Sequence, residues 1–258
     1  AANVEIGCRP ETFATEFRFL RQFIPAQPYR GGWRAKTWFP DIHVTYHAGE
    51  DFLDLVDGMR AIDEAVRFLA FQRGDRIGHA LALGVEPAMH YGFKGRNIVL
   101  PKQVRLDDLV WVLYRGGELG LELDSSSRWK LQNEAEHLLM DIYGAWMEQV
   151  RYRYTLGEYY QMWQLRGDAP DLYSYTGFRT PGRVYADPCE RFYLQEQEGL
   201  SAYRSQRPIA RLYYGYHFDN AIKKKGTQVV STQIEGWYEA IVQELQVQLQ
   251  RDLSSKGI

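Results

Sequence analysis

Cysteine, long apolar runs and excess charge are all scarce in this sequence. Its 258 residues contain only two cysteines, Cys8 and Cys189, which are too few and too far apart to build a disulfide scaffold. No apolar run is long enough to cross a bilayer, and the N-terminus has no basic region followed by a hydrophobic signal core. We therefore expect a protein of a reducing compartment, the cytoplasm, that does not span a membrane.

The small net charge and the apolar content set further limits. The formal net charge is −2, so no overall basic surface indicates nucleic-acid binding. Hydrophobic residues make up 45% of the chain and aromatic residues 14%, which is enough for a core and argues against a disordered chain. The length suits one large domain or two small ones. Because the sequence starts at Ala1 and enters a short apolar segment at residues 4–6, we interpret it as a piece of a longer protein.

Two short predicted strands each end at a histidine. β-branched and aromatic residues predict a buried strand at residues 42–46, and His47 follows it. Residues 76–78 predict a second strand that ends at His79. Between the strands, residues 52–72 carry apolar side chains at helical spacing. In a parallel α/β structure the carboxyl ends of strands share one edge, so we expect the two histidines to converge there.

A carboxylate accompanies the first histidine. Glu50 comes three residues after His47, beyond a glycine that lets the backbone turn. A neutral imidazole can bind a metal ion or move a proton near pH 7, and a nearby carboxylate can act as an acid or a base. Taken singly, a histidine at a strand end can also be a hydrogen-bonded structural residue. We adopt this structural interpretation for His43, which lies earlier in the first strand.

The two motifs together, HAGE at residues 47–50 and RIGH at residues 76–79, resemble the adenosine/AMP deaminase family. The resemblance implies that His47 is a zinc ligand, that Glu50 donates a proton to the purine ring, and that His79 positions the attacking water. The family usually has glycine after the second histidine, where this sequence has Ala80.

The resemblance also implies a fold. We expect an α/β protein with a partial (β/α)8 TIM barrel of the metal-dependent hydrolase type and a large, mainly helical insertion. The predicted divisions are residues 1–94 for the partial barrel, residues 95–232 for the insertion, and residues 233–258 for a helix that returns to the barrel. An insertion of this size resembles the large prokaryotic deaminases of RNA-editing phage-defence systems, which implies a homo-oligomer acting on adenine nucleotides.

Other parts of the family's site are absent from this sequence. The family's paired histidines would precede Ala1, and its metal-binding aspartate would follow Ile258. Because catalytic zinc needs three or more protein ligands, His47 alone should not hold zinc stoichiometrically in this chain. Gly7 is the candidate for the family's purine-contacting glycine, and its alternative is a simple turn residue.

Helical patterns dominate the remainder of the chain. Apolar spacing and capping residues predict helices at residues 106–114, 128–150, 155–166 and 233–253. A run of basic residues indicates a solvated loop, with phosphate contact as the alternative; its members are Lys94, Arg96, Lys102 and Arg105. His217 and Asp219 have the spacing of a metal-binding pair, but no third ligand is near in sequence, so we interpret them as structural.

These observations predict a zinc-dependent aminohydrolase that deaminates an adenine nucleoside or nucleotide at purine C6, with this chain as an inactive piece of it. Two alternatives stay open. One is another metal-dependent amidohydrolase that uses the same strand ends on a different substrate. The other is a non-catalytic assembly module in which the helical segment is the functional part.

Overall fold

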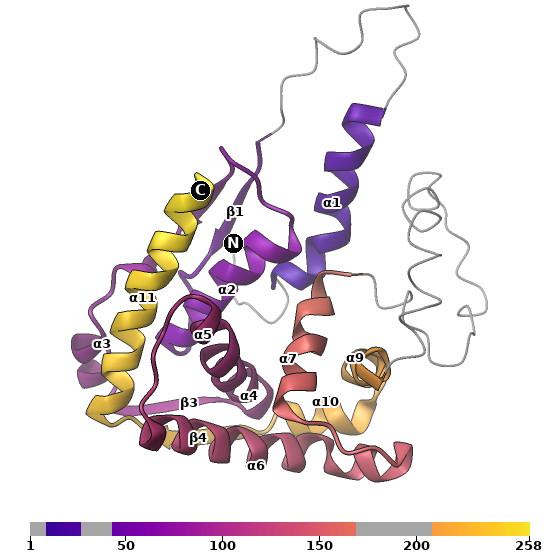
Figure 1. Ribbon diagram of the computed structural model, residues 1–258, viewed down its shortest axis with the longest axis vertical. Helices are drawn as coiled ribbons and strands as arrows, with labels where there is room; N and C mark the ends of the chain where they lie inside the picture. The colour runs from indigo at the N-terminus through magenta and orange to yellow at the C-terminus, as the bar shows by residue number, and fades with distance from the viewer. Residues whose placement is uncertain (1–8, 27–42, 169–207) are drawn as a thin grey trace, which may run out of the picture.

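The computed structural model of the protein describes residues 9–26, 43–168 and 208–258. In these residues the chain is a mainly helical α/β protein whose strands form two separate two-stranded sheets (Figure 1). None of the described helices combines the length and the apolar character that a membrane span requires. The expected strand at residues 4–6 and the candidate purine contact Gly7 lie outside the described residues.

The two sheets differ in direction and in the connections they make. Strand β1 (Thr45–Ala48) pairs in parallel with β2 (Arg76–His79), and helix α2 (Leu55–Phe68) connects them. Strand β3 (Asn97–Pro101) pairs antiparallel with β4 (Val229–Gln233). The β3–β4 pair therefore joins the two ends of the segment predicted as an insertion. The four described strands form no barrel, and only the β1–α2–β2 unit corresponds to the predicted partial barrel.

Helix α2 is buried around almost its whole circumference. Its apolar stripe, predicted from helical spacing, lies in the core, with Leu55, Met59 and Ile62 fully buried. Asp54 caps the N-terminus by accepting a hydrogen bond from the backbone N–H of Leu55. The helix is shorter than predicted because it ends at Phe68, just before Ala70 adopts a left-handed backbone with φ of 53°.

The opposite face of α2 carries buried charges. Arg60 donates to Asp108 Oδ1 (2.8 Å) and to Asp57 Oδ1 (2.9 Å), and it also bonds to Glu64. Burial by itself lowers the pKa of a guanidinium. The charges of these three carboxyl groups and of nearby Asp107 have the larger opposite effect, so the pKa of Arg60 is raised well above its ordinary value. Charged groups persist in a core only when they are paired in this way.

One long helical segment follows β3 directly. Helix α4 (Lys102–Val110) continues through a π-helical turn, η3 (Trp111–Arg115), into α5 (Gly116–Glu118). The helix predicted at residues 106–114 therefore starts earlier and extends further. Pro101 explains the start, since the strand ends at this proline and the helix begins at the next residue.

The predicted solvated basic loop is confirmed only in part, because Lys94 and Arg96 lie in the turn before β3, with Arg96 exposed, whereas the other two residues do not. Two of its residues lie on α4, where Arg105 is buried against Glu134 and Lys102 bonds to Asp141. Arg96 forms an ion pair with Glu239 at 2.8 Å. Lys94 donates to the carbonyl of Leu53. Because protein groups already satisfy these cations, the run gives no support to phosphate contact.

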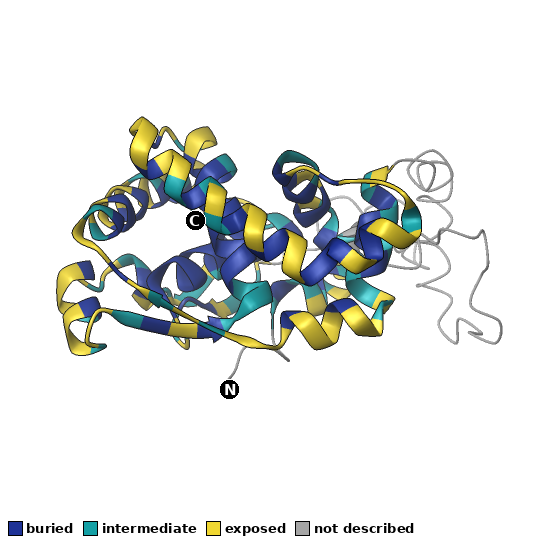
Figure 2. Ribbon diagram, turned by 90° about the horizontal axis from the view of Figure 1, so that it is seen from below, coloured by how far each residue is buried: buried dark blue, intermediate teal, exposed yellow. Residues whose placement is uncertain are grey.

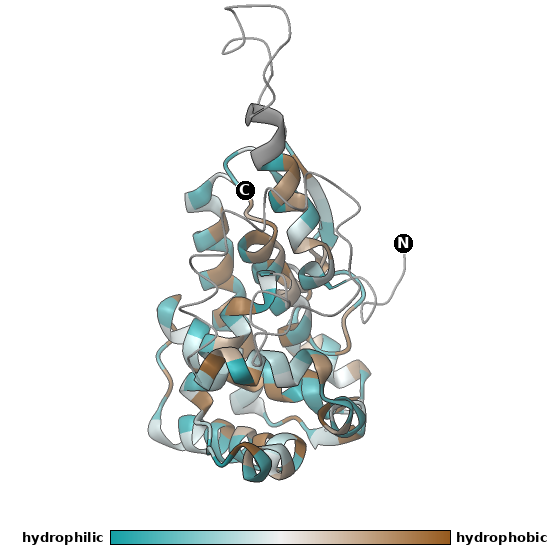
Figure 3. Cartoon of the chain, turned by 90° about the vertical axis from the view of Figure 1, so that its right-hand side faces the viewer, coloured by the Kyte–Doolittle hydropathy of each residue, from teal (hydrophilic) through white to brown (hydrophobic). Residues whose placement is uncertain are grey.

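The other helices pack around α2 and α4, and most present one buried and one exposed side (Figure 2). Apolar and polar residues alternate along them accordingly (Figure 3). They are α1 (Pro10–Ala26), η2 (Leu81–Leu83), α3 (Pro87–Phe93), α6 (Ser125–Val150), α7 (Leu156–Gln164), η4 (Leu165–Gly167), α9 (Pro208–Phe218), α10 (Asn220–Gly226) and α11 (Gly236–Lys256).

Local signals located some helix ends correctly and missed others. The capping box of Thr155 and Glu158 before α7 is confirmed. Asp124, not a serine, caps α6 by accepting from two backbone N–H groups. The final helix starts at Gly236, three residues later than predicted, because the preceding residues pair as β4.

We predict that Arg60→Ala destabilises the protein by about 3–5 kcal/mol, because it leaves Asp57, Glu64 and Asp108 buried without their shared cation. Arg67→Ala on the same helix is the matched control, since Arg67 is partly exposed and should cost less than about 1 kcal/mol. Urea unfolding of both variants measures the difference. Equal losses would show that the buried network contributes no more than a surface pair.

Candidate metal centre at the strand ends

The parallel pairing of β1 and β2 brings both histidines to one edge of the sheet. In its register, His47 lies beside Gly78 and Ala48 lies beside His79. Glu50 follows β1 in the turn that leads towards α2. The structure thus produces the convergence that the two strand-end motifs predict.

The three side chains approach one another through their nitrogen and oxygen atoms. The Nδ1 atoms of His47 and His79 are 3.2 Å apart, and His47 Nδ1 is 3.5 Å from Glu50 Oε1. The second carboxylate oxygen, Oε2, contacts Nδ1 of His79. The two imidazole rings lie edge to face, with centroids 4.8 Å apart and planes at 73°. Glu50 therefore bridges the two rings.

This donor set fits a zinc ion. One ligand atom from each of the three residues lies within 4.8 Å of the others, and no other such group occurs among the described residues. Tetrahedral zinc with bonds of about 2.0–2.1 Å separates its ligand atoms by about 3.3–3.4 Å. The 3.2 Å and 3.5 Å separations agree with that spacing. Glu50 Oε2, in contrast, lies in direct contact with His79 Nδ1, so these two atoms would have to move apart to admit an ion. The structure thus places two further possible donors beside His47, so metal binding by this chain is a prediction that can be tested.

The centre is open to solvent on one side. The side chains of His47 and His79 are 57% and 53% exposed, whereas that of Glu50 is 22% exposed. A structural zinc site encloses its ion with four protein ligands, whereas a catalytic site keeps a position for water. The exposure leaves room for a water molecule beside the three donors.

Close contacts with α2 fix the turn after β1. Gly49 has a φ of +73°, and a Cβ at this position would lie 2.5 Å from Ile62 Cδ1. The carbonyl of Gly49 accepts a hydrogen bond of 2.8 Å from the N–H of Ala82, after β2. Gly58 of α2 packs just as closely, because its Cβ would lie 2.6 Å from Ala82 Cβ. Glycine at positions 49 and 58 therefore lets helix α2 pack directly against the turns after β1 and β2.

The backbone after β2 is strained. His79 and Ala80 are consecutive non-glycine residues in the left-handed region, with φ of 63° and 49°. The N–H of Ala80 lies 2.9 Å from the carbonyl of Gly78 and 3.2 Å from that of Ala48. Left-handed backbone favours glycine, which gives a physical reason for the glycine usually found at this position in the deaminase family.

Gly78 shapes the site, although sequence reasoning did not identify it. A Cβ here would lie 2.9 Å from two ring carbons of His47, so the imidazole rests directly on the backbone of β2. A glycine inside a strand often marks such a close approach, and this was the signal available in the sequence.

The other candidate residues lie outside this centre. His43 is exposed, with Nδ1 3.8 Å from Asp75 Oδ1. Asp219 caps α10 by accepting from the backbone N–H groups of Ala221 and Ile222, as its structural interpretation predicts.

Comparison of the chain with models of known protein families finds no match, and a search of curated proteins finds no similar sequence. The assignment of the centre therefore depends on its own geometry and on the two motifs.

We predict that the chain binds one zinc or cobalt ion and that His47→Ala abolishes this binding, because two donors remain. His43→Ala is the matched control, since it removes a nearby exposed histidine that contributes no donor. Elemental analysis after dialysis measures the metal content. Undiminished metal in His47→Ala would place the ion elsewhere.

Gly78→Ala should weaken metal binding about tenfold or more without removing a donor, because the new methyl group displaces the His47 ring. Gly84→Ala serves as the control, since a Cβ there meets nothing closer than 4.0 Å. Titration with cobalt, followed by its visible absorption, compares the two variants. Unchanged affinity in Gly78→Ala would mean that the position of the ring does not matter.

Proposed function

We propose that the protein contributes to a zinc-dependent aminohydrolase that deaminates an adenine nucleoside or nucleotide at purine C6. The observation that carries the proposal is the convergence of His47, Glu50 and His79 at the ends of two parallel strands. The HAGE and RIGH motifs supply the reaction class through their resemblance to adenosine/AMP deaminases.

The same proposal extends to the fold. The β1–α2–β2 unit has the direction, the connecting helix and the strand-end placement of one repeat in a (β/α)8 barrel. The described residues contain only this one parallel pair, so further strands and zinc ligands would have to come from another part of the protein.

Each residue has a distinct role in this proposal. In the intact protein, His47 would hold a zinc ion together with ligands from the rest of the protein. Glu50 and His79, which are the other donors available in this chain alone, would then be free for other roles. When bound, zinc lowers the pKa of a coordinated water towards neutrality. His79, held against the Glu50 carboxylate, would orient the attacking water and accept its proton. Glu50 delivers a proton to the purine ring, and its contact with both imidazoles gives it a route to exchange protons with them.

The segment at residues 95–232 would act in self-association or in covering the substrate. Large apolar side chains remain exposed on it, namely those of Val99, Trp129 and Val229. These side chains are available for contact with another copy of the chain, as the proposed homo-oligomer requires.

The division of labour between His47 and Glu50 gives the test. In the intact protein, we predict that Glu50→Gln keeps its zinc and loses about 10²–10⁴-fold in turnover, because the amide retains the shape but cannot deliver the proton. His47→Ala should lose both zinc and activity. Ammonia release from adenosine, AMP and ATP, together with elemental analysis, measures the two effects.

Three results would contradict the proposal in separable ways. Turnover of Glu50→Gln within a few-fold of wild type would remove Glu50 as the proton donor. Loss of zinc from Glu50→Gln would make the carboxylate a ligand instead. A zinc-loaded intact protein that releases no ammonia from any adenine compound would contradict the substrate class while leaving the metal centre in place.

A further inference from the structure

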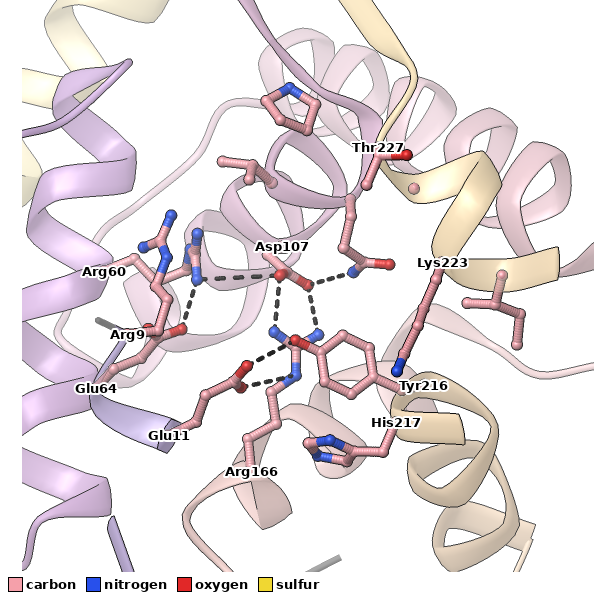
Figure 4. A pocket seen from close by; sticks show the side chains of 15 residues that line it. Arg9, Glu11, Arg60, Glu64, Asp107, Arg166, Tyr216, His217, Lys223 and Thr227 are labelled. Atoms are coloured by element: carbon pink, nitrogen blue, oxygen red, sulfur yellow. Dashed lines mark hydrogen bonds and ion pairs between the residues drawn. The ribbon is translucent and has the colours of Figure 1, made fainter. Parts of the chain in front are cut away.

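A cavity lies between six helical elements and shares no residue with the strand-end centre (Figure 4). Its volume is 470 Å³, within the range of about 300–1,000 Å³ typical of small-molecule sites. Its lining residues come from helices α1, α2 and α4 and from η4, α9 and α10, with Arg9 before α1 and Pro101 at the end of β3.

The acidic residues of the cavity are already bonded. Arg166 donates two hydrogen bonds of 2.7 Å to the carboxylate of Asp107. Glu64 accepts from Arg60 and from Trp163 Nε1. Glu11 accepts from the Tyr216 hydroxyl at 2.9 Å, and burial raises the pKa of Glu11 towards the neutral form. No carboxylate in this set needs a further cation.

Two buried nitrogen atoms of the cavity, in contrast, have no hydrogen bond. Arg166 is 2% exposed, yet its Nε has no hydrogen bond, with Glu11 Oε2 at 3.9 Å. Nε2 of His217 is buried and likewise has no hydrogen bond. Lys223 also lines the cavity but is an exposed residue. Among the described residues its ammonium forms neither an ion pair nor a hydrogen bond, and its side chain runs down beside the Tyr216 ring (Figure 4). Buried polar atoms without partners usually mark a bound water, ion or ligand.

Two cationic side chains lie near His217, namely Arg166, which is paired with Asp107, and Lys223. Burial, with the charges of Arg166 and Lys223, lowers the pKa of His217 to about 3. The imidazole is therefore neutral at physiological pH and can donate one hydrogen bond. Lys223 brings a positive charge that no described carboxylate compensates.

We propose that this cavity binds a small organic molecule with an oxyanion head, either a phosphate or a carboxylate. The oxygens of the head accept hydrogen bonds from Lys223 and His217, in the field of Arg166. The body of the ligand lies against the apolar wall formed by Pro101, Val104 and Ile222. The volume exceeds that of a bare inorganic ion, which is why the ligand has an organic body.

Calorimetric titration of the full chain tests this, with phenyl phosphate, benzoate and inorganic phosphate as probes. EDTA treatment beforehand prevents binding to metal at the strand ends. We expect phenyl phosphate or benzoate to bind once per chain, at least tenfold more tightly than inorganic phosphate. The tighter of the two aromatic anions identifies the head. If neither phenyl phosphate nor benzoate binds, the proposal is wrong. If inorganic phosphate binds as tightly as these two, the inference that the ligand has an organic body is wrong.

Neighbouring lysines provide a matched pair of variants. Lys223→Gln should weaken binding about tenfold, because it removes a charged donor at the cavity. Lys224→Gln makes the same change of net charge on the same helix outside the cavity, and should alter the affinity less than twofold. His217→Phe, with its fold checked by circular dichroism, should also weaken binding. If the two lysine substitutions weaken binding equally, the anion is attracted only by the overall charge, and the proposed site is wrong.

Discussion

The strand-end centre depends on how closely helix α2 approaches the turns after β1 and β2. Ile62 occupies the space that a side chain at position 49 would need, and Gly58 admits the methyl group of Ala82. The hydrogen bond from Ala82 to Gly49 then ties the two turns together. Because the helix holds both turns, His79 can keep a left-handed backbone that would otherwise relax. Packing against the helix thus holds the donor atoms in place.

The buried charged side chains of α2 bond to residues of the segment predicted as an insertion. Asp63 accepts hydrogen bonds from Trp111 and Arg115, while Arg60 and Glu64 bond to Asp108 and Trp163. The helices after residue 95 and the strand-end unit therefore share one core.

Sequence patterns predicted the local features and missed those that depend on distant partners. The β1–α2–β2 unit, the capping box at Thr155 and the meeting of His47 with His79 follow from periodicity and short motifs. Strand β4 was missed, because a short strand with one exposed face is defined by its partner β3 more than by its own residues. The cavity around Arg166 unites side chains from α1 to α10, and no local pattern predicts such a meeting.

The position of a bound metal ion tests the proposed centre most directly. Anomalous diffraction at the zinc absorption edge, from crystals of the zinc-loaded chain, locates the ion directly. The account predicts one strong peak between the ends of β1 and β2, within bonding distance of His47 and beside Glu50 and His79. A peak at His43 and Asp75, or at His217 and Asp219, or no peak at all, would contradict it.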